Sequence, residues 1–232
     1  MRLLVLYDNV AESPLIAGWG FSALVEAQGR VFLFDAGADR GILKHNVETL
    51  GVDLSRVTDI FISHPHCDHI GGLSYPLELV EGGRMWAPES AVGPLRARAR
   101  AAKMALFAVK EPRDLGDGFW STGQMGLSPG EQGLIVPTDK GPILITGCAH
   151  PGVERMARRA VRLTGRKLRL VIGGFHLLDA DAERLREVVQ GLQETTEGVA
   201  PGHCTGEKAT EALLSAFPGS PHLKVGLQME FP

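Results

Sequence analysis

The chain is organised around residues 60–73, which read Ile60-Phe61-Ile62-Ser63-His64-Pro65-His66-Cys67-Asp68-His69-Ile70-Gly71-Gly72-Leu73. The apolar residues 60–62 predict a short buried strand. Four potential metal ligands follow within six residues: His64, His66, Asp68 and His69. Imidazole and carboxylate groups this close repel one another and lose solvation unless a cation holds them together. The segment therefore predicts a metal site at the end of a buried strand.

The spacing of these four side chains leaves room for two ions. His64 and His66 are two residues apart, so on an extended segment their side chains point the same way. Asp68 and His69 come from the turn that follows, where they can reach a second ion beside the first. The glycine pair at 71–72 lets the backbone turn tightly away from the site. A loop that is rich in histidine by chance is the alternative, and the average composition of proteins makes it improbable.

Segments 64–69, 147–150, 173–177 and 201–206 together resemble one known family. The run His64-Pro65-His66-Cys67-Asp68-His69 resembles the His-x-His-x-Asp-His signature of the metallo-β-lactamase superfamily. The other segments look most like the branch that contains dihydropterin-6-methyl-aminobenzene-ribofuranosyl-phosphate synthase-like proteins. They are Gly147-Cys148-Ala149-His150, Gly173-Gly174-Phe175-His176-Leu177 and Pro201-Gly202-His203-Cys204-Thr205-Gly206. The resemblance covers nearly the whole chain, from Asp35 to Thr205 at least.

The fold that this resemblance implies is an αββα sandwich of the metallo-β-lactamase type, with two mixed sheets face to face and helices outside. Spacing alone predicts only a mixed α/β protein. The chain has 232 residues, which is enough to bury a full core as one domain. No linker or low-complexity tract interrupts the sequence, so we expect a single domain over residues 1–232.

Composition narrows the class of protein. The hydrophobic fraction of 44% and the charged fraction of 22% are typical of a soluble globular protein, and the net charge of −3 gives no reason to expect nucleic acid or a membrane surface as a partner. The apolar run near Met1 is too short for a signal peptide, and no stretch approaches transmembrane length, so we expect a cytoplasmic location. The odd number and wide spacing of the cysteines imply no disulfide framework.

Periodicity and turn residues predict the order of the elements. We expect strands at 2–7, 21–27, 31–34, 60–62, 85–87, 134–137, 142–146, 168–172, 199–203 and 224–231. We expect helices at 41–50, 93–104, 153–162, 185–192 and 205–217. The helix at 93–104 carries Arg96, Arg98, Arg100 and Lys103. These cations form either a solvated face or part of a lid that meets an anionic substrate. Residues 107–122 are expected to be irregular and to belong to the same lid.

The resemblance also implies a set of metal ligands. His64, His66 and His150 would hold one ion, and Asp68, His69 and His203 would hold the other. The chain departs from the common pattern twice. Cys148 stands where superfamily members often have a bridging Asp, and Pro129-Gly130-Glu131 stands where they often have a ligand His. In the branch that this chain resembles, His150 makes up the missing imidazole. Cys148 is then a thiolate ligand, a small residue near the site or a redox liability, and we favour the second.

Three further residues are expected to support the site. By resemblance, Asp35 would hold the metal loop, although a simple turn aspartate fits the same position. His176 follows a strand and a glycine pair, so it either plays a structural role or faces the site as a general acid, a substrate contact or a ligand. The helix that begins near Thr205 has its N-terminus beside His203, and free N–H groups there favour an anion such as a phosphate, so we expect Thr205 to contact the substrate. We read His45 and His222 as surface residues.

The function that the resemblance implies uses two divalent ions, with Zn²⁺ favoured and Mn²⁺ or Fe²⁺ as alternatives. The ions would bridge a hydroxide that attacks a small anionic ester or phosphoester, while Asp68 anchors one ion and orients the nucleophile. The first hypothesis is therefore a metal-dependent hydrolase. A transferase like the synthase branch is the alternative, and a metal-binding sensor without catalytic activity is a third. A di-iron redox centre is disfavoured because no electron-transfer domain is attached.

Overall fold

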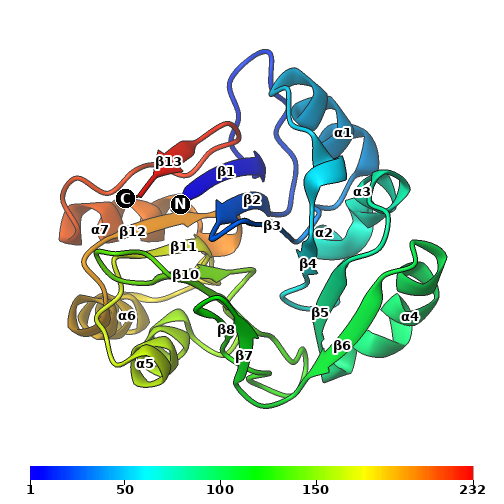
Figure 1. Ribbon diagram of the computed structural model, residues 1–232. Helices are drawn as coiled ribbons and strands as arrows, with labels where there is room; N and C mark the ends of the chain where they lie inside the picture. The colour runs from blue at the N-terminus through cyan, green and yellow to red at the C-terminus, as the bar shows by residue number, and fades with distance from the viewer. Residues whose placement is uncertain (232) are drawn as a thin grey trace.

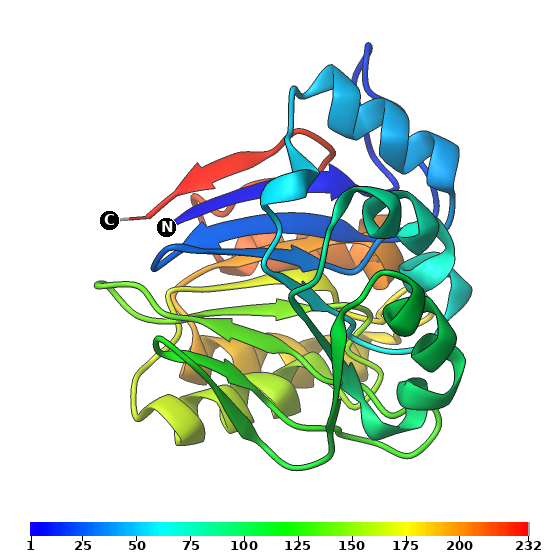
Figure 2. The same cartoon turned by 45° about the vertical axis from the view of Figure 1, so that its right-hand side comes forward.

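Two β-sheets lie face to face in the computed structural model of this protein, which describes residues 1–231, and helices cover the outer face of each sheet (Figures 1 and 2). The first sheet has the strand order β13-β1-β2-β3-β4-β5-β6, and the second has the order β12-β11-β10-β9-β8-β7. Both sheets are mixed. This is the predicted αββα architecture.

The first sheet consists of β1 (Arg2–Tyr7), β2 (Ser22–Ala27), β3 (Arg30–Phe34), β4 (Asp59–Phe61), β5 (Arg84–Pro88), β6 (Ala105–Val109) and β13 (Gln228–Glu230). Strands β3 to β6 run parallel to one another, whereas the pairs β13–β1, β1–β2 and β2–β3 are antiparallel. Helices α1 (Arg40–Thr49), α3 (Ser74–Leu79) and α4 (Val92–Ala101) lie on its outer face, while the short α2 (Cys67–Ile70) follows the histidine-rich segment.

The second sheet consists of β7 (Arg113–Gly116), β8 (Phe119–Ser121), β9 (Leu134–Val136), β10 (Ile143–Thr146), β11 (Leu170–Gly174) and β12 (Val199–Gly202). Strands β10, β11 and β12 are parallel. Helices α5 (Val153–Thr164), α6 (Ala182–Thr195) and α7 (Glu207–Ala216) cover its outer face. Among residues 1–231, no helix is both long and apolar enough to cross a bilayer.

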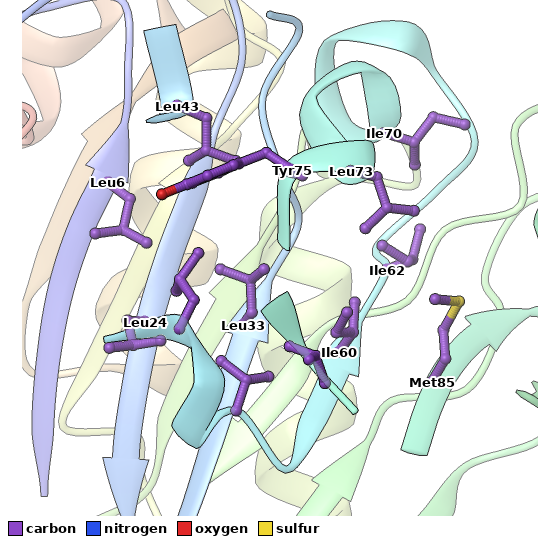
Figure 3. Close-up of a cluster of buried hydrophobic side chains, with 14 of the residues drawn as sticks. Leu6, Leu24, Leu33, Leu43, Ile60, Ile62, Ile70, Leu73, Tyr75 and Met85 are labelled. Carbon is purple, nitrogen blue, oxygen red and sulfur yellow. The ribbon is translucent and has the colours of Figure 1, made fainter. Parts of the chain in front are cut away.

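The alternating direction of side chains along each strand determines whether a side chain packs against the helices or between the two sheets. Side chains on a strand point to opposite faces in turn. In β3, Leu33 packs towards the helices, whereas Phe32 and Phe34 pack between the two sheets. In β4, Ile60 packs towards the helices and Phe61 packs between the sheets. Figure 3 shows the helix-facing cluster, in which strand residues such as Leu24 and Leu33 lie below Leu43 and Tyr75.

Parallel strands bring the predicted site loops to one edge of the sandwich. The segments that follow β3 and β4 belong to the first sheet, and those that follow β10, β11 and β12 belong to the second. Parallel strands deliver their carboxyl ends to the same edge, where α/β proteins place their ligands. Histidines that are far apart in the sequence therefore meet at that edge.

Most predicted elements are confirmed, but two predictions were wrong and one helical stretch was missed. Residues 107–122 are not irregular, because they contain β6, β7 and β8. Their glycines form the turn of the β7–β8 hairpin, where Gly116, Asp117 and Gly118 all have positive φ. The final strand is shorter than predicted and spans only Gln228–Glu230. The helical turns from Cys67 to Leu79 were not predicted, because ligand residues hid their apolar pattern.

The predicted lid is also not found. Residues 107–122 are strands, and α4 packs on the outer face of the first sheet through Leu95 and Ala99. Arg96 and Arg100 are exposed, and Arg98 Nη1 donates to the carbonyl of Ile70. These arginines therefore form a solvated helix face, which was the other reading of the same pattern.

Candidate metal centre

His64, His66 and His150 form the first donor group. Each offers one ring nitrogen, and these nitrogens lie within 4.8 Å of one another. His64 Nε2 is 3.1 Å from His66 Nδ1, and the rings of His64 and His150 are 4.7 Å apart. His64 is buried and comes directly after β4, whereas His66 is exposed and His150 is half-buried. The group is thus open to solvent on one side.

Asp68, His69, Cys148 and His203 form the second donor group, whose ligand atoms also lie within 4.8 Å of one another. Cys148 Sγ is 3.2 Å from His69 Nε2 and 3.3 Å from His203 Nε2. Asp68 Oδ2 is 3.2 Å from His203 Nε2. Asp68 is half-buried, and the other three side chains are buried.

The two donor groups are neighbours. The ring centroids of His64 in the first group and His69 in the second are 4.2 Å apart. The structure therefore brings together every residue that was predicted as a ligand, in the predicted pairing of segments. It adds Cys148, which was expected to lie near the site without ligating. Whether each side chain binds metal stays a prediction.

Four of the five imidazoles are held at Nδ1 by an oxygen of the protein. The pairs are His64 with Ser63 Oγ at 2.9 Å, His69 with Asp35 Oδ2 at 2.7 Å, His150 with Glu131 Oε2 at 2.8 Å, and His203 with Asn9 Oδ1 at 3.2 Å. A carboxylate or amide oxygen only accepts, and Ser63 Oγ already donates to Asp35, so all four Nδ1 atoms carry the proton. The Nε2 atoms of His64, His69 and His150 then present a lone pair, whereas Nε2 of His203 donates to Asp68 Oδ2 at 3.2 Å. Metal-binding histidines are oriented in this way, so the donor set fits divalent metal ions.

Asp35 ties the histidine-rich segment to the end of β3. It is fully buried and accepts from Ser63 N at 2.8 Å, from Ser63 Oγ at 2.6 Å and from His69 Nδ1. These contacts are the ones expected for a residue that holds the metal loop. Burial raises the pKa of Asp35 to about 8 and lowers the pKa of His69 to about 4. Burial and the nearby His69 also lower the pKa of His64 to about 3, which keeps this ring neutral and able to bind metal.

Charge distinguishes the donors of the second group. Burial alone would raise the pKa of Asp68, but the hydrogen bond with His203 and the nearby imidazoles hold it below its usual range. The pKa of Cys148 is raised by its contact with Cys204, by burial and by nearby carboxylates. A thiol binds metal as the thiolate, so this sulfur would lose its proton on binding a cation.

Glu131 supports the site, and sequence reasoning missed that role. It is fully buried, and its carboxylate accepts from the backbone N–H groups of Cys148, Ala149 and His150 as well as from His150 Nδ1. Burial works against its ionisation, but the hydrogen bonds from His150 and from Ala149 N lower the pKa of Glu131 to about 2. The only signal in the sequence was that Glu131 occurs where a ligand histidine is common.

Asp8 and Asn9 at the end of β1 were also missed. Asp8 Oδ1 accepts from His203 N at 2.9 Å, and Asn9 Nδ2 donates to His203 O at 3.1 Å. His203 has a φ of 47°, so these contacts support a left-handed backbone conformation that residues with a side chain rarely adopt. Burial raises the pKa of Asp8 to about 6. A polar pair that ends an apolar strand was the available signal.

The structure places His176 at the mouth of the site. Its side chain is exposed, and its ring is 4.5 Å from that of His150. A hydrogen bond with Cys204 raises the pKa of His176 above its ordinary value. These positions suit a substrate contact or a proton donor. His222 is exposed and His45 is half-buried, and neither belongs to a donor group.

The hydroxyl of Thr205 is hydrogen-bonded within the protein. Thr205 is fully buried, and its hydroxyl donates to Gly202 O at 2.6 Å and accepts from Phe175 N at 3.2 Å. This side chain therefore supports the backbone around His203, and the predicted contact between Thr205 and a substrate stays a prediction.

Comparison with known proteins agrees with this geometry. A family model described as anti-Pycsar protein Apyc1 matches residues 15–79, which is less than a third of the chain. The chain is 26% identical to the 7,8-dihydropterin-6-methyl-4-(β-D-ribofuranosyl)-aminobenzene-5′-phosphate synthase of Methanocaldococcus jannaschii, over 94% of this chain and 92% of that protein.

Solved structures are similar over the full length. One is described as a metal-dependent hydrolase of the β-lactamase superfamily; it has a TM-score of 0.81 and 28% identity, and the match covers 99% of this chain and 98% of that one. The metallo-β-lactamase fold protein YhfI from Bacillus subtilis has a TM-score of 0.72 and 13% identity over 99% of both chains. The solved structures thus share the fold of this chain, and the similar proteins include both a hydrolase and a synthase.

Proposed function

The chain has the metallo-β-lactamase fold, and we propose that it is a metal-dependent hydrolase that acts on a small anionic ester or phosphoester. The observation that carries the proposal is the pair of adjacent donor groups, each built from both halves of the chain. The donor groups lie at the carboxyl ends of the strands, where α/β proteins bind their ligands. The similarity to a metal-dependent hydrolase supports the same conclusion.

We propose that the two donor groups hold two divalent cations. Five imidazoles, one carboxylate and one thiol converge. Nitrogen and thiolate ligands suit Zn²⁺ best, although Mn²⁺ and Fe²⁺ also accept nitrogen and oxygen ligands. In this proposal Cys148 is a ligand, because its sulfur lies 3.2 Å from His69 Nε2 and 3.3 Å from His203 Nε2.

The bound cations would lower the pKa of a water molecule towards ~7 and stabilise the negative charge that develops on the substrate. The remaining steps belong to the side chains. Asp68 is half-buried at the boundary between the imidazoles and solvent, where its carboxylate can orient the attacking water. His176 lies exposed beside His150 and is placed to donate a proton to the leaving group.

Metal analysis followed by an activity assay tests the proposal. The purified protein is stripped with a chelator, reloaded with Zn²⁺, Mn²⁺ or Fe²⁺, and assayed with bis-p-nitrophenyl phosphate and with p-nitrophenyl esters. We expect two equivalents of metal and hydrolysis that disappears on stripping and returns on reloading. A protein that binds metal and hydrolyses neither class of substrate would point to a sensor instead.

A transferase is the second candidate, and a specific observation favours it. The relative in M. jannaschii is named as a synthase, and the alignment covers over nine-tenths of both proteins. The same donor groups would then stabilise the negative charge of a leaving group while an aryl amine attacks. Incubation of the metal-loaded protein with dihydropterin pyrophosphate and an aryl amine would yield a coupled product if this candidate is correct, and a hydrolysed pterin if the hydrolase is correct.

A further inference from the structure

We propose that Glu131 is the positioning residue that makes His150 a metal ligand. Its carboxylate closes the turn at residues 148–150 and orients the imidazole towards His64 and His66. The inference rests on the proposed metal centre and extends it by assigning a role to a buried acid. It also explains how the first donor group is completed in a chain that has Glu131 where related proteins often have a histidine.

The backbone around Glu131 is fixed to the histidine-rich segment. Glu131 and Met125 form a β-bridge, with N···O distances of 2.9 and 2.7 Å. The next residue, Gln132, donates from its backbone to Ser63 O at 3.0 Å and from its side chain to Ile62 O at 2.8 Å. Glu131 therefore starts from a rigid position beside the end of β4, and its carboxylate reaches across to the segment that follows β10.

Three consecutive backbone N–H groups converge on this carboxylate. Oε1 accepts from Cys148 N at 2.9 Å and from Ala149 N at 2.7 Å, and Oε2 accepts from His150 N at 2.9 Å. Ala149 has a φ of 60°, a left-handed conformation that lets successive N–H groups point to one centre. Such a concave arrangement binds anions in many proteins, and here the anion is a side chain of the same protein.

The same carboxylate sets the ring of His150. Oε2 lies 2.8 Å from Nδ1 and can only accept, so Nδ1 carries the proton and Nε2 is left for a metal. The side chain of His150 is 16% exposed, so packing alone constrains it less than it constrains the fully buried His64. A carboxylate behind a metal-binding histidine typically changes metal affinity 10- to 100-fold.

Cobalt titration of four proteins separates this role from a purely structural one. The proteins are the parent, Glu131→Gln, His150→Ala and the double variant. Gln keeps the size of the side chain, but it offers one acceptor oxygen and places an NH₂ group against the N–H donors. We expect each single variant to lower the affinity of the first donor group for its ion by about 10- to 100-fold. The thiolate-to-cobalt absorption band from Cys148 is expected to persist, because it reports the second group.

Coupling between the two substitutions is the decisive result. If Glu131 acts through His150, the double variant binds the first ion no more weakly than His150→Ala alone. Independent, multiplicative losses would overturn the proposal, as would a Glu131→Gln protein that binds both ions like the parent. Glu154→Gln is the matched control, because Glu154 is also a buried acid but pairs with Arg184 on α6. A parent that binds no cobalt would refute the proposed function instead.

A second measurement does not depend on a variant that folds. Nitrogen-15 NMR of the metal-free parent protein reports which ring nitrogen of His150 is protonated. The proposal requires the Nδ1–H form, and the Nε2–H form would overturn it. Circular dichroism of metal-free Glu131→Gln tests for loss of fold; if the fold is lost, the ring tautomer together with the His150→Ala titration decides.

Discussion

The two donor groups differ in burial and in charge, although they lie side by side. The first group consists of imidazoles alone, and one of its members, His66, is exposed. The second group has a carboxylate and a thiol among its donors, and three of its four members are buried. Anionic ligands and burial both strengthen the binding of a cation. The second group should therefore bind its ion more tightly, and the first should fill and exchange more readily.

What supports the groups differs in the same direction. The second group is fixed by Asp35 behind His69 and by Asp8 and Asn9 behind His203. The first group has Ser63 behind His64 and Glu131 behind His150, while among residues 1–231 no protein oxygen is hydrogen-bonded to the ring of His66. One centre can thus combine a firmly held ion with a labile one, and substitutions should affect the two ions separately.

The largest effect is expected from Asp68→Asn. The substitution removes the only carboxylate in either donor group. We expect kcat/KM on a p-nitrophenyl substrate to fall on the order of 10²–10³-fold, comparable with the loss of a group that stabilises charge in the transition state. His222→Ala, on the exposed surface, serves as the control. Unchanged activity in Asp68→Asn would show that the second group is not part of the reaction centre.

Cys148→Ser should lower the affinity of the second donor group for its ion and leave the ion of the first donor group in place. Oxygen of a serine hydroxyl is a poorer ligand for Zn²⁺ than a thiolate, so we expect roughly a 10- to 100-fold loss of affinity, as for other changes around a metal ligand. Competition with a chromophoric chelator measures the loss. If both ions remain at parental affinity, Cys148 is the small near-site residue that the sequence suggested, and the contrast between the groups weakens.

The third prediction concerns the pH dependence of the metal-free protein. His64 has a pKa of about 3 in the folded state, well below its ordinary value near 6.5. Below pH 6.5 the unfolded chain binds a proton at this residue and the folded chain does not. The free energy of unfolding therefore decreases as pH falls. Relative to His64→Asn, the parent should lose about 2 kcal/mol of unfolding free energy between pH 7 and pH 5.

Denaturant unfolding of both proteins at the two pH values measures this difference. Using the variant as a reference removes the contributions of Asp8, Asp35 and the other groups that both proteins share. A difference that is independent of pH would mean that His64 is accessible to protons, and that the first group is more open than the structure has it.

The smallest effect is expected from His66→Ala. This side chain is exposed, so its removal leaves no buried cavity and should not change the fold. We expect the second donor group to keep its ion, and the first donor group to bind its ion roughly 10-fold more weakly. Elemental analysis after gel filtration measures the stoichiometry. Parental stoichiometry after dilute dialysis would count against the first donor group.

Sequence reasoning succeeded where one short segment carries its own chemistry. Four donors within residues 64–69 are improbable by chance, and alternation along β3 and β4 defines which side faces each layer. His150 and His203 could be named only through resemblance, because nothing in their local sequence distinguishes a ligand from a structural histidine.

The residues behind the ligands were beyond a reading of the sequence. Asp8 and His203 are 195 positions apart, and Glu131 and His150 are 19 apart, so the contacts exist only in the folded chain. The glycines and the proline led to the wrong prediction of an irregular segment at residues 107–122, because these residue types occur both in hairpin turns and in irregular loops.

Each donor group takes members from both sheets. His64, His66, Asp68 and His69 follow a strand of the first sheet, whereas His150, Cys148 and His203 follow strands of the second. In the proposed metal centre, a bound cation would link the segments that follow strands of the two sheets. Ligands that bind only the native state stabilise it in proportion to the logarithm of their concentration, so chelation should loosen the packing between the sheets. Metal supply in the cell would then govern how long the polypeptide survives as well as how fast it works.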